Sequence, residues 1–160
     1  MNVSYVSGKD LETYLAKFND MKVNYDRFSP GIFEGFEGFS PIDVIEDKCQ
    51  FIIATTKDNE VVGVIKFKRY KSSNHDFLSE EDFLAYKKGI KNYKGIMFVD
   101  VREDFRKMGI ARQMISYFCN ITEKEGAKTA IRLGRLTSLG KDAKLLDIFR
   151  EYLPGRDVKL

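Results

Sequence analysis

Short apolar runs, separated by charged or glycine-containing stretches, divide the centre of this sequence into predicted β-strands. Residues 51–55 (FIIAT) and 61–67 (VVGVIKF) are two such runs, and the polar segment 57–60 between them predicts a β-hairpin. The apolar run 95–101 predicts a further strand, and residues 2–6 predict a short one near the start of the chain. We expect these segments to share one sheet.

Apolar residues at helical spacing predict helices before and after this central region. The clearest lie at 109–124 and 141–153, and another lies at 11–18. A shorter helix is expected from Pro41, because proline is favoured at the first helical position. A polar insertion contains one more predicted helix, at 80–88.

A strand at 129–136, in which apolar and polar residues alternate, separates the last two predicted helices. The elements therefore follow the order β-α-α-β-β-α-β-α-β-α. A hairpin followed by a β-α-β unit predicts an α/β fold with a mixed sheet and helices on its faces. The chain of 160 residues is long enough for one core, and we expect a single domain over residues 1–160.

The composition narrows the function mainly by exclusion. A net charge of +3 without a concentrated basic stripe does not indicate nucleic-acid binding. The sequence contains no long apolar run, so neither a membrane-spanning helix nor a secretion signal is predicted. The two cysteines, Cys49 and Cys119, and the single histidine, His75, have no metal-binding spacing. We therefore expect a cytoplasmic protein without a metal ion and without a nucleic-acid or membrane partner.

The stretch 98–113 (FVDVREDFRKMGIARQ) carries the strongest functional pattern. An apolar strand ends in charged residues, and Gly109 then opens an amphipathic helix. The N–H groups of a first helical turn, together with the helix dipole, favour an anion at that point. Arg106, Lys107 and Arg112 crowd the same end, although cations disfavour a helix N-terminus. A bound phosphate group would explain them; the alternative is an ordinary strand-turn-helix with a solvated basic corner.

These residues resemble the acetyl-coenzyme A (acetyl-CoA) motif of the GNAT family of N-acetyltransferases. That motif has Arg or Gln, two further residues, Gly, one residue, and then Gly or Ala, and residues 106–111 (RKMGIA) match it. The match lies between a strand and a helix, as in the family, and Gly63 in the hairpin is also similar. The resemblance implies a mixed, mostly antiparallel, twisted sheet of five or six strands with helices on both faces, and acetyl-CoA as cosubstrate.

The resemblance also implies which residues hold the cosubstrate. The backbone N–H of Val101 would polarise the thioester carbonyl, with Val99 beside the acetyl arm. Gly109 would let the backbone approach a pyrophosphate closely because it has no Cβ. Lys107 and Arg112 would add charge-assisted contacts. The residues expected to contact acetyl-CoA are Val99, Asp100, Val101, Arg106, Lys107, Met108, Gly109, Ile110, Ala111 and Arg112.

The catalytic groups are matched less clearly. The family implies direct attack by an amine, with a base that accepts a proton and an acid, often a tyrosine on the last helix, that protonates the thiolate. Phe149 occupies the tyrosine position and cannot donate. Tyr152, one helical turn further along the same face, is therefore the candidate acid, the alternative being an ordinary core or surface tyrosine. Ser138, after the fifth strand, is a second candidate. No residue identifies itself as the base, because Glu34 and Glu37 are better explained as solvated carboxylates.

The C-terminal region departs from the family, which usually closes with two more strands. Only six residues follow Pro154, so these strands are expected to be short or missing. An incomplete sheet edge is a template for pairing, and a second copy of the chain could complete it as a homodimer.

The leading hypothesis is an acetyl-CoA-dependent N-acetyltransferase that acts on an unidentified primary amine, on a small molecule or a protein, by direct attack in a ternary complex. Two alternatives have the same fold without the reaction. One is a catalytically silent CoA-binding protein, and the other is a protein-interaction module.

Overall fold

A computed structural model of the chain describes a sheet and the helices that pack on it. The described residues are 1–6, 25–28, 50–71, 92–125, 129–133, 144–154 and 158–159. The helices predicted at 11–18, from Pro41 and at 80–88 lie outside these residues and stay predictions.

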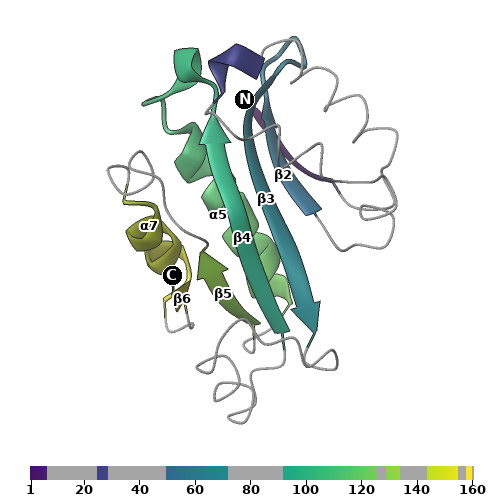
Figure 1. Cartoon of the computed structure of the whole chain (residues 1–160), viewed down its shortest axis with the longest axis vertical. Helices are drawn as coiled ribbons and strands as arrows, with labels where there is room; N and C mark the ends of the chain where they lie inside the picture. The colour runs from purple at the N-terminus through teal and green to yellow at the C-terminus, as the bar shows by residue number, and fades with distance from the viewer. Residues whose placement is uncertain are drawn as a thin grey trace.

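Six strands form one sheet, and their order in the sheet is their order along the chain (Figure 1). The strands are β1 (Asn2–Val6), β2 (Gln50–Thr55), β3 (Val61–Lys71), β4 (Asn92–Val101), β5 (Thr129–Leu133) and β6 (Val158–Lys159). Strands β1 to β4 pair antiparallel with one another, whereas β5 is parallel to β4 and β6 is parallel to β5. The mixed, mostly antiparallel sheet that the sequence predicts is confirmed.

Strands β3 and β4 are longer than their apolar runs predict. The residues up to Lys71 and from Asn92 onward, which look like parts of a polar insertion, belong to this ladder, in which Arg69 opposes Lys94. Backbone pairing extends the two strands into charged sequence because the hydrogen bonds of a ladder do not depend on apolar side chains.

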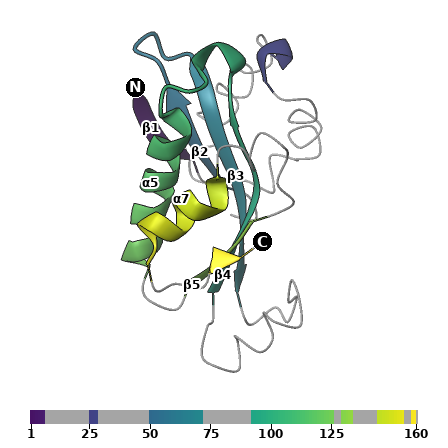
Figure 2. The same ribbon diagram turned by 90° about the vertical axis from the view of Figure 1, so that its left-hand side faces the viewer.

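Two α-helices, α5 (Ile110–Lys124) and α7 (Leu145–Tyr152), lie on the same face of the sheet (Figure 2). Two short 3-10 helices, η2 (Tyr25–Arg27) and η4 (Glu103–Phe105), complete the described helical elements. The helices expected on the other face lie outside the described residues. Among the helices described, none is both long and apolar enough to cross a membrane.

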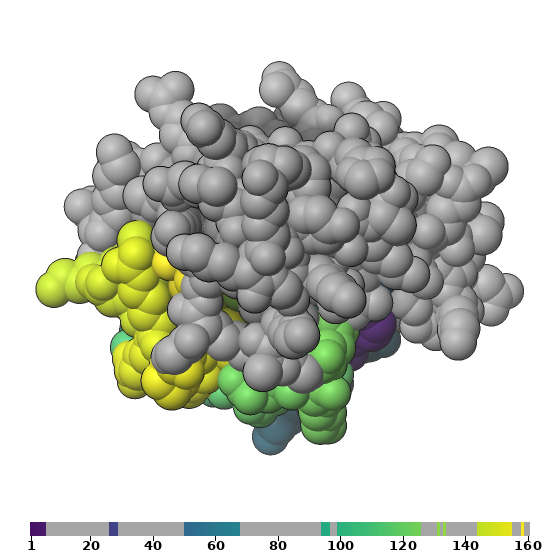
Figure 3. Space-filling view, turned by 90° about the horizontal axis from the view of Figure 1, so that it is seen from below, coloured from purple at the N-terminus to yellow at the C-terminus, as the bar shows by residue number. Residues whose placement is uncertain are grey.

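The apolar face predicted for α5 is buried against the sheet. Met114, Ile115 and Phe118 are fully buried and belong to the main core. The ring of Phe118 meets Phe67 of β3 edge-on, with centroids 5.0 Å apart, and meets Phe149 of α7 in the same way at 5.7 Å. Such pairs add about 0.5–1.5 kcal/mol to the burial itself. They hold α7 beside α5, and the two helices lie next to each other on the surface in Figure 3.

A bulge in β4 sets which side chains face α5. Phe67 opposes Ile96, and the next pair along the ladder involves Phe98, which leaves Met97 as an extra residue on β4. An extra residue reverses the alternation of side chains along a strand. Val99 therefore faces the same side as Ile96, and both pack in the core under α5.

Gly63 on β3 lies directly beneath the start of α5. A Cβ atom at this position would be 2.9 Å from Met114 Cε and 3.2 Å from Ile110 Cγ2. We expect Gly63→Ala to be tolerated because the flexible end of Met114 can move. The branched side chain of Gly63→Val should instead lower the free energy of unfolding by about 1–3 kcal/mol. Urea unfolding of both variants measures the difference; a Gly63→Val protein as stable as the wild type would contradict the tight contact.

Lys94 is a buried charge in the first half of β4. Its Nζ donates to Thr122 Oγ1 at 3.0 Å and pairs with Glu125 Oε2 at 3.0 Å. The same ammonium lies over the rings of Phe67 and Phe118, at 5.6 Å and 5.1 Å from their centroids. Lys94 therefore ties β4 to the C-terminal end of α5, where the helix dipole favours a cation.

The chain after α7 adds the two-residue strand β6. Val158 opposes Ile131 of β5, and its carbonyl accepts a hydrogen bond from Nε of Arg150 on α7 at 3.2 Å. The C-terminal strand in the described part of the chain is short, as the sequence predicts.

Candidate cofactor site

The matched motif begins at the end of β4, where side chains alternate between two faces. Val101 is buried in the core under α5, and Val99 packs against the same core. Asp100 points to the opposite face, as strand alternation predicts, and its Oδ1 lies 3.5 Å from Nη2 of Arg106. The carboxylate of Asp100 therefore has a cationic partner within the motif itself.

The backbone of Val101 points to the side of β4 that carries β5. N–H and C=O groups alternate between the two sides of a strand, and the N–H of Arg102 donates to the carbonyl of Val62 on β3 at 2.8 Å. The backbone groups of Val101 therefore point the other way, and its carbonyl accepts a hydrogen bond from Arg106 Nε at 2.8 Å. On this side the described pairing with β5 ends at Ile96, and β4 continues beyond it.

The turn between η4 and α5 uses left-handed backbone at two positions. Lys107 has φ 62° and Gly109, the N-cap of α5, has φ 80°. Glycine adopts this conformation without strain, and a Cβ atom added at Gly109 would meet no atom within 4 Å. The first turn of α5 has no acidic residue, and no side chain caps it. The N-terminus of α5 thus has the backbone geometry and the electrostatics of an anion site.

The three cations of the motif point in different directions. Arg106 turns back toward β4, while Lys107 is exposed. Arg112 leaves the turn and donates to both carboxylate oxygens of Glu151 on α7, at 3.0 and 3.1 Å. The hydrogen bonds from Arg112 to Glu151 raise the pKa of the guanidinium. Both partners of the ion pair are exposed, and such pairs are weak, so Arg112 is able to exchange Glu151 for another anion.

Phe149 and Tyr152, the two positions considered for the catalytic acid, differ in how deeply they are buried. Phe149 is fully buried in the core, and Tyr152 at the end of α7 is partly exposed. Tyr152 follows Glu151, whose carboxylate accepts from Arg112 of α5, and it packs against the core. Ser138, Glu34 and Glu37 lie outside the described residues, and the roles considered for them stay predictions.

The family model for the acetyltransferase (GNAT) family matches residues 22–143, which is more than half of the chain. The chain belongs to the GNAT family. No curated protein matches its sequence.

Solved structures of other acetyltransferases share this fold. A ribosomal-protein-alanine N-acetyltransferase from Brucella melitensis biovar Abortus 2308 aligns with TM-score 0.54 and 13% identity, over 92% of this chain and 89% of its own. An aminoglycoside acetyltransferase from an uncultured soil metagenomic sample aligns with TM-score 0.59 and 16% identity, over 98% and 91%. An acetyltransferase of Trypanosoma brucei aligns with TM-score 0.51 and 13% identity, over 97% and 92%. At these identities the likeness shows the GNAT fold and no more.

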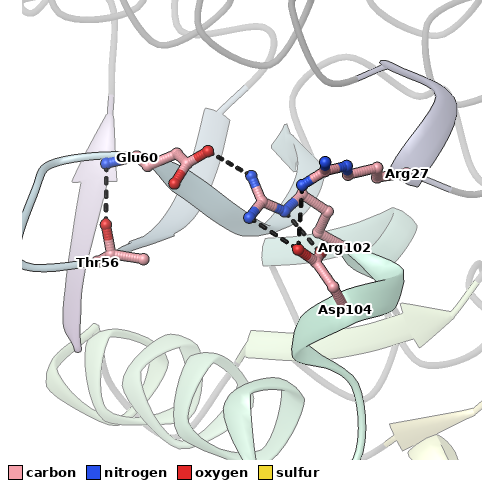
Figure 4. Close-up of polar contacts among 5 residues, drawn as sticks. All are labelled: Arg27, Thr56, Glu60, Arg102 and Asp104. Carbon is pink, nitrogen blue, oxygen red and sulfur yellow. Dashed lines mark hydrogen bonds and ion pairs between the residues drawn. The ribbon is translucent and has the colours of Figure 1, made fainter.

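A cluster of charges beneath the GNAT motif was not predicted from the sequence (Figure 4). Arg102 is 3% exposed, and its guanidinium donates from Nη1 to Glu60 Oε1 at 2.6 Å. It also donates from Nε and Nη2 to the two carboxylate oxygens of Asp104, at 2.7 and 3.0 Å. Arg27 of η2 donates to Asp104 as well, at 3.2 Å. We call Arg27, Glu60, Arg102 and Asp104 the Arg102 cluster.

The contacts within the Arg102 cluster shift the pKa values of its own members. The hydrogen bond from Arg102 lowers the pKa of Asp104 below the ordinary aspartate value, and the carboxylate stays ionised. Burial by itself would lower the pKa of Arg102, but its hydrogen bonds with Asp104 and Glu60 raise it. The only signals in the sequence were a charge directly after an apolar strand and an acid two residues later, and neither indicates Glu60 or Arg27. The described residues contain no group of acidic, histidine or cysteine side chains that could hold a metal ion.

Proposed function

We propose that this GNAT chain transfers the acetyl group of acetyl-CoA to a primary amine, by direct attack within a ternary complex. The observation that carries the proposal is the left-handed Gly109 at the N-terminus of α5, immediately after the end of β4. This arrangement offers backbone N–H groups and the positive end of a helix dipole to a diphosphate. Cosubstrate binding by Arg106 to Arg112, with Val99, Asp100 and Val101 beside the thioester, follows from it.

The backbone of Val101 has the direction that the reaction needs. Its N–H points to the side of β4 opposite β3, where a thioester carbonyl could accept its hydrogen bond. Arg106 holds the Val101 carbonyl on the same side, which limits rotation of the peptide groups around it. A preorganised donor of this kind stabilises the negative charge that develops on the carbonyl oxygen. Tyr152 is the proposed acid for the thiolate, and Ser138 a proposed contact to the cosubstrate.

A catalytically silent CoA-binding protein is the second candidate, and one observation favours it. Phe149 fills the position of the family's tyrosine and is fully buried against Phe118, so no hydroxyl can be supplied there. Under this alternative the turn at Gly109 binds CoA but no acetyl transfer follows.

The acceptor is proposed only as a class. The names of two structural neighbours specify a ribosomal-protein alanine and an aminoglycoside, and both statements hold for those proteins alone.

A small number of cysteines supports a reducing, cytoplasmic setting for the proposed enzyme.

One pair of measurements tests the proposal and separates the candidates. Calorimetric titration of the chain with CoA and acetyl-CoA is expected to show binding of both. Thiol release from acetyl-CoA should then be followed with a peptide bearing a free N-terminal amine, an aminoglycoside and a polyamine. Binding with amine-dependent thiol release supports the transferase. Binding without release for every acceptor supports the silent protein, and absence of binding contradicts both.

A further inference from the structure

The Arg102 cluster has a fixed end in the turn between β2 and β3. The N–H of Glu60 donates to Thr56 Oγ1 at 3.2 Å, and the carbonyl of Glu60 accepts from the N–H of Thr56 at 2.9 Å (Figure 4). The N–H of Asn59 donates to the carbonyl of Thr56 at 2.9 Å. These bonds close the hairpin on itself. The carboxylate that accepts from Arg102 Nη1 therefore belongs to a turn that is closed by three hydrogen bonds of its own.

The other end of the cluster holds η4. The planar guanidinium of Arg102 forms a bidentate pair with both carboxylate oxygens of Asp104. Its central carbon lies 4.8 Å from the ring centroid of Phe105. The N–H of Phe105 in turn donates to the carbonyl of Arg102 at 2.8 Å. Helix η4 contains no fully buried residue. Phe105 packs partly buried against the core, and the Arg102 side chain adds the polar contacts to Asp104 that hold η4 in place.

The position of η4 determines where the cofactor turn begins. Lys107 and Gly109 lie two and four residues after the end of η4, and their left-handed backbone leads into the N-terminus of α5. Groups that bind a ligand must be held to within about 0.5 Å, and small displacements weaken binding steeply. A shift of η4 is passed to the N–H groups of the first turn of α5 through only a few residues.

We propose that Arg102 is a positioning residue, which holds the turn 103–109 in the shape that binds the phosphates of CoA; this inference rests on the proposed function. Arg102 does not contact the cosubstrate in this proposal. It transfers the rigidity of the β2–β3 turn, through Glu60 and Asp104, to the cofactor turn. The competing explanation is that Arg102 stabilises the fold and has no specific effect on CoA.

Two substitutions of Arg102 separate these explanations. Arg102→Met keeps the apolar stem and removes the charge, and Arg102→Lys keeps the charge and removes the fork. Lys94→Met is the matched control, because Lys94 is a buried cation on the same strand that pairs with the far end of α5. For each protein we would measure the Kd of CoA by calorimetry, well below the melting temperature, and the melting temperature itself.

The proposal expects Arg102→Met to weaken CoA binding about tenfold or more, and Arg102→Lys to weaken it less. Lys94→Met should leave the Kd within about twofold of the wild type, whatever it does to the melting temperature. Wild-type affinity in both Arg102 variants would overturn the proposal, and so would an equal loss in Lys94→Met. If Arg102→Met does not fold, Arg102→Lys and Glu60→Gln carry the test. Failure of the wild-type chain to bind CoA would overturn the proposed function itself.

Discussion

Replacing Gly109 with aspartate is expected to raise the Kd of CoA by about a hundredfold or more. The added carboxylate would stand at the N-cap of α5, where the proposed diphosphate lies. Two unit charges 4 Å apart near a protein surface repel each other by about 4 kcal/mol, which corresponds to roughly a thousandfold. A Cβ atom at Gly109 meets no other atom within 4 Å, so the cost to the fold is the strain of a non-glycine residue at φ 80°. Calorimetric titration with CoA measures the loss.

Gly109→Asn is the matched control for this charge. Asparagine and aspartate have the same size, and both adopt left-handed backbone more readily than most residues. The cost of leaving glycine at φ 80° is therefore shared by the two variants, and their difference in Kd reports the charge. We expect Gly109→Asn to bind CoA more weakly than the wild type but much more tightly than Gly109→Asp. Equal affinities for the two variants would mean that no phosphate lies at this turn.

Local sequence pattern was sufficient for the hairpin and for α5, because their periodicities are strong and their neighbours along the chain are also their neighbours in space. The pattern failed at the ends of β3 and β4, where charged residues up to Lys71 and from Asn92 pair across the ladder. It also gave no sign of the bulge at Met97. All residues from Ile96 to Val99 are apolar, so a run without alternation does not reveal where the alternation is reversed.

The candidate site likewise has a part that the sequence predicted and a part that only the structure shows. The strand, glycine and helix of the motif are contiguous, and the sequence predicted them together. The Arg102 cluster joins four residues between Arg27 and Asp104, and only the structure brings them into contact. The ion pair between Arg112 and Glu151 is likewise a contact between two helices that the sequence does not relate. Long-range partners of charged side chains depend on tertiary packing, which periodicity does not encode.

Tyr152→Phe is expected to lower kcat by about a hundredfold, with little change in the Kd of acetyl-CoA. A positioned general acid contributes about 10²–10⁴ to the rate, and phenylalanine removes only the hydroxyl. Tyr152 is next in sequence to Glu151, whose carboxylate accepts from Arg112 in the first turn of α5, so this end of α7 lies beside the proposed cosubstrate. Steady-state kinetics with a saturating amine, combined with calorimetric titration, separates an effect on kcat from an effect on binding.

Tyr117→Phe provides the control for this loss of a hydroxyl. Tyr117 lies on α5 and packs against the same core, but it has no part in the proposed site. Its substitution should leave kcat unchanged. A Tyr152→Phe protein with wild-type kcat would remove Tyr152 from the mechanism. Since Phe149 at the family's position cannot donate, the thiolate would then have to leave unprotonated or take its proton from water, and the backbone N–H of Val101 would be the main catalytic group left on β4.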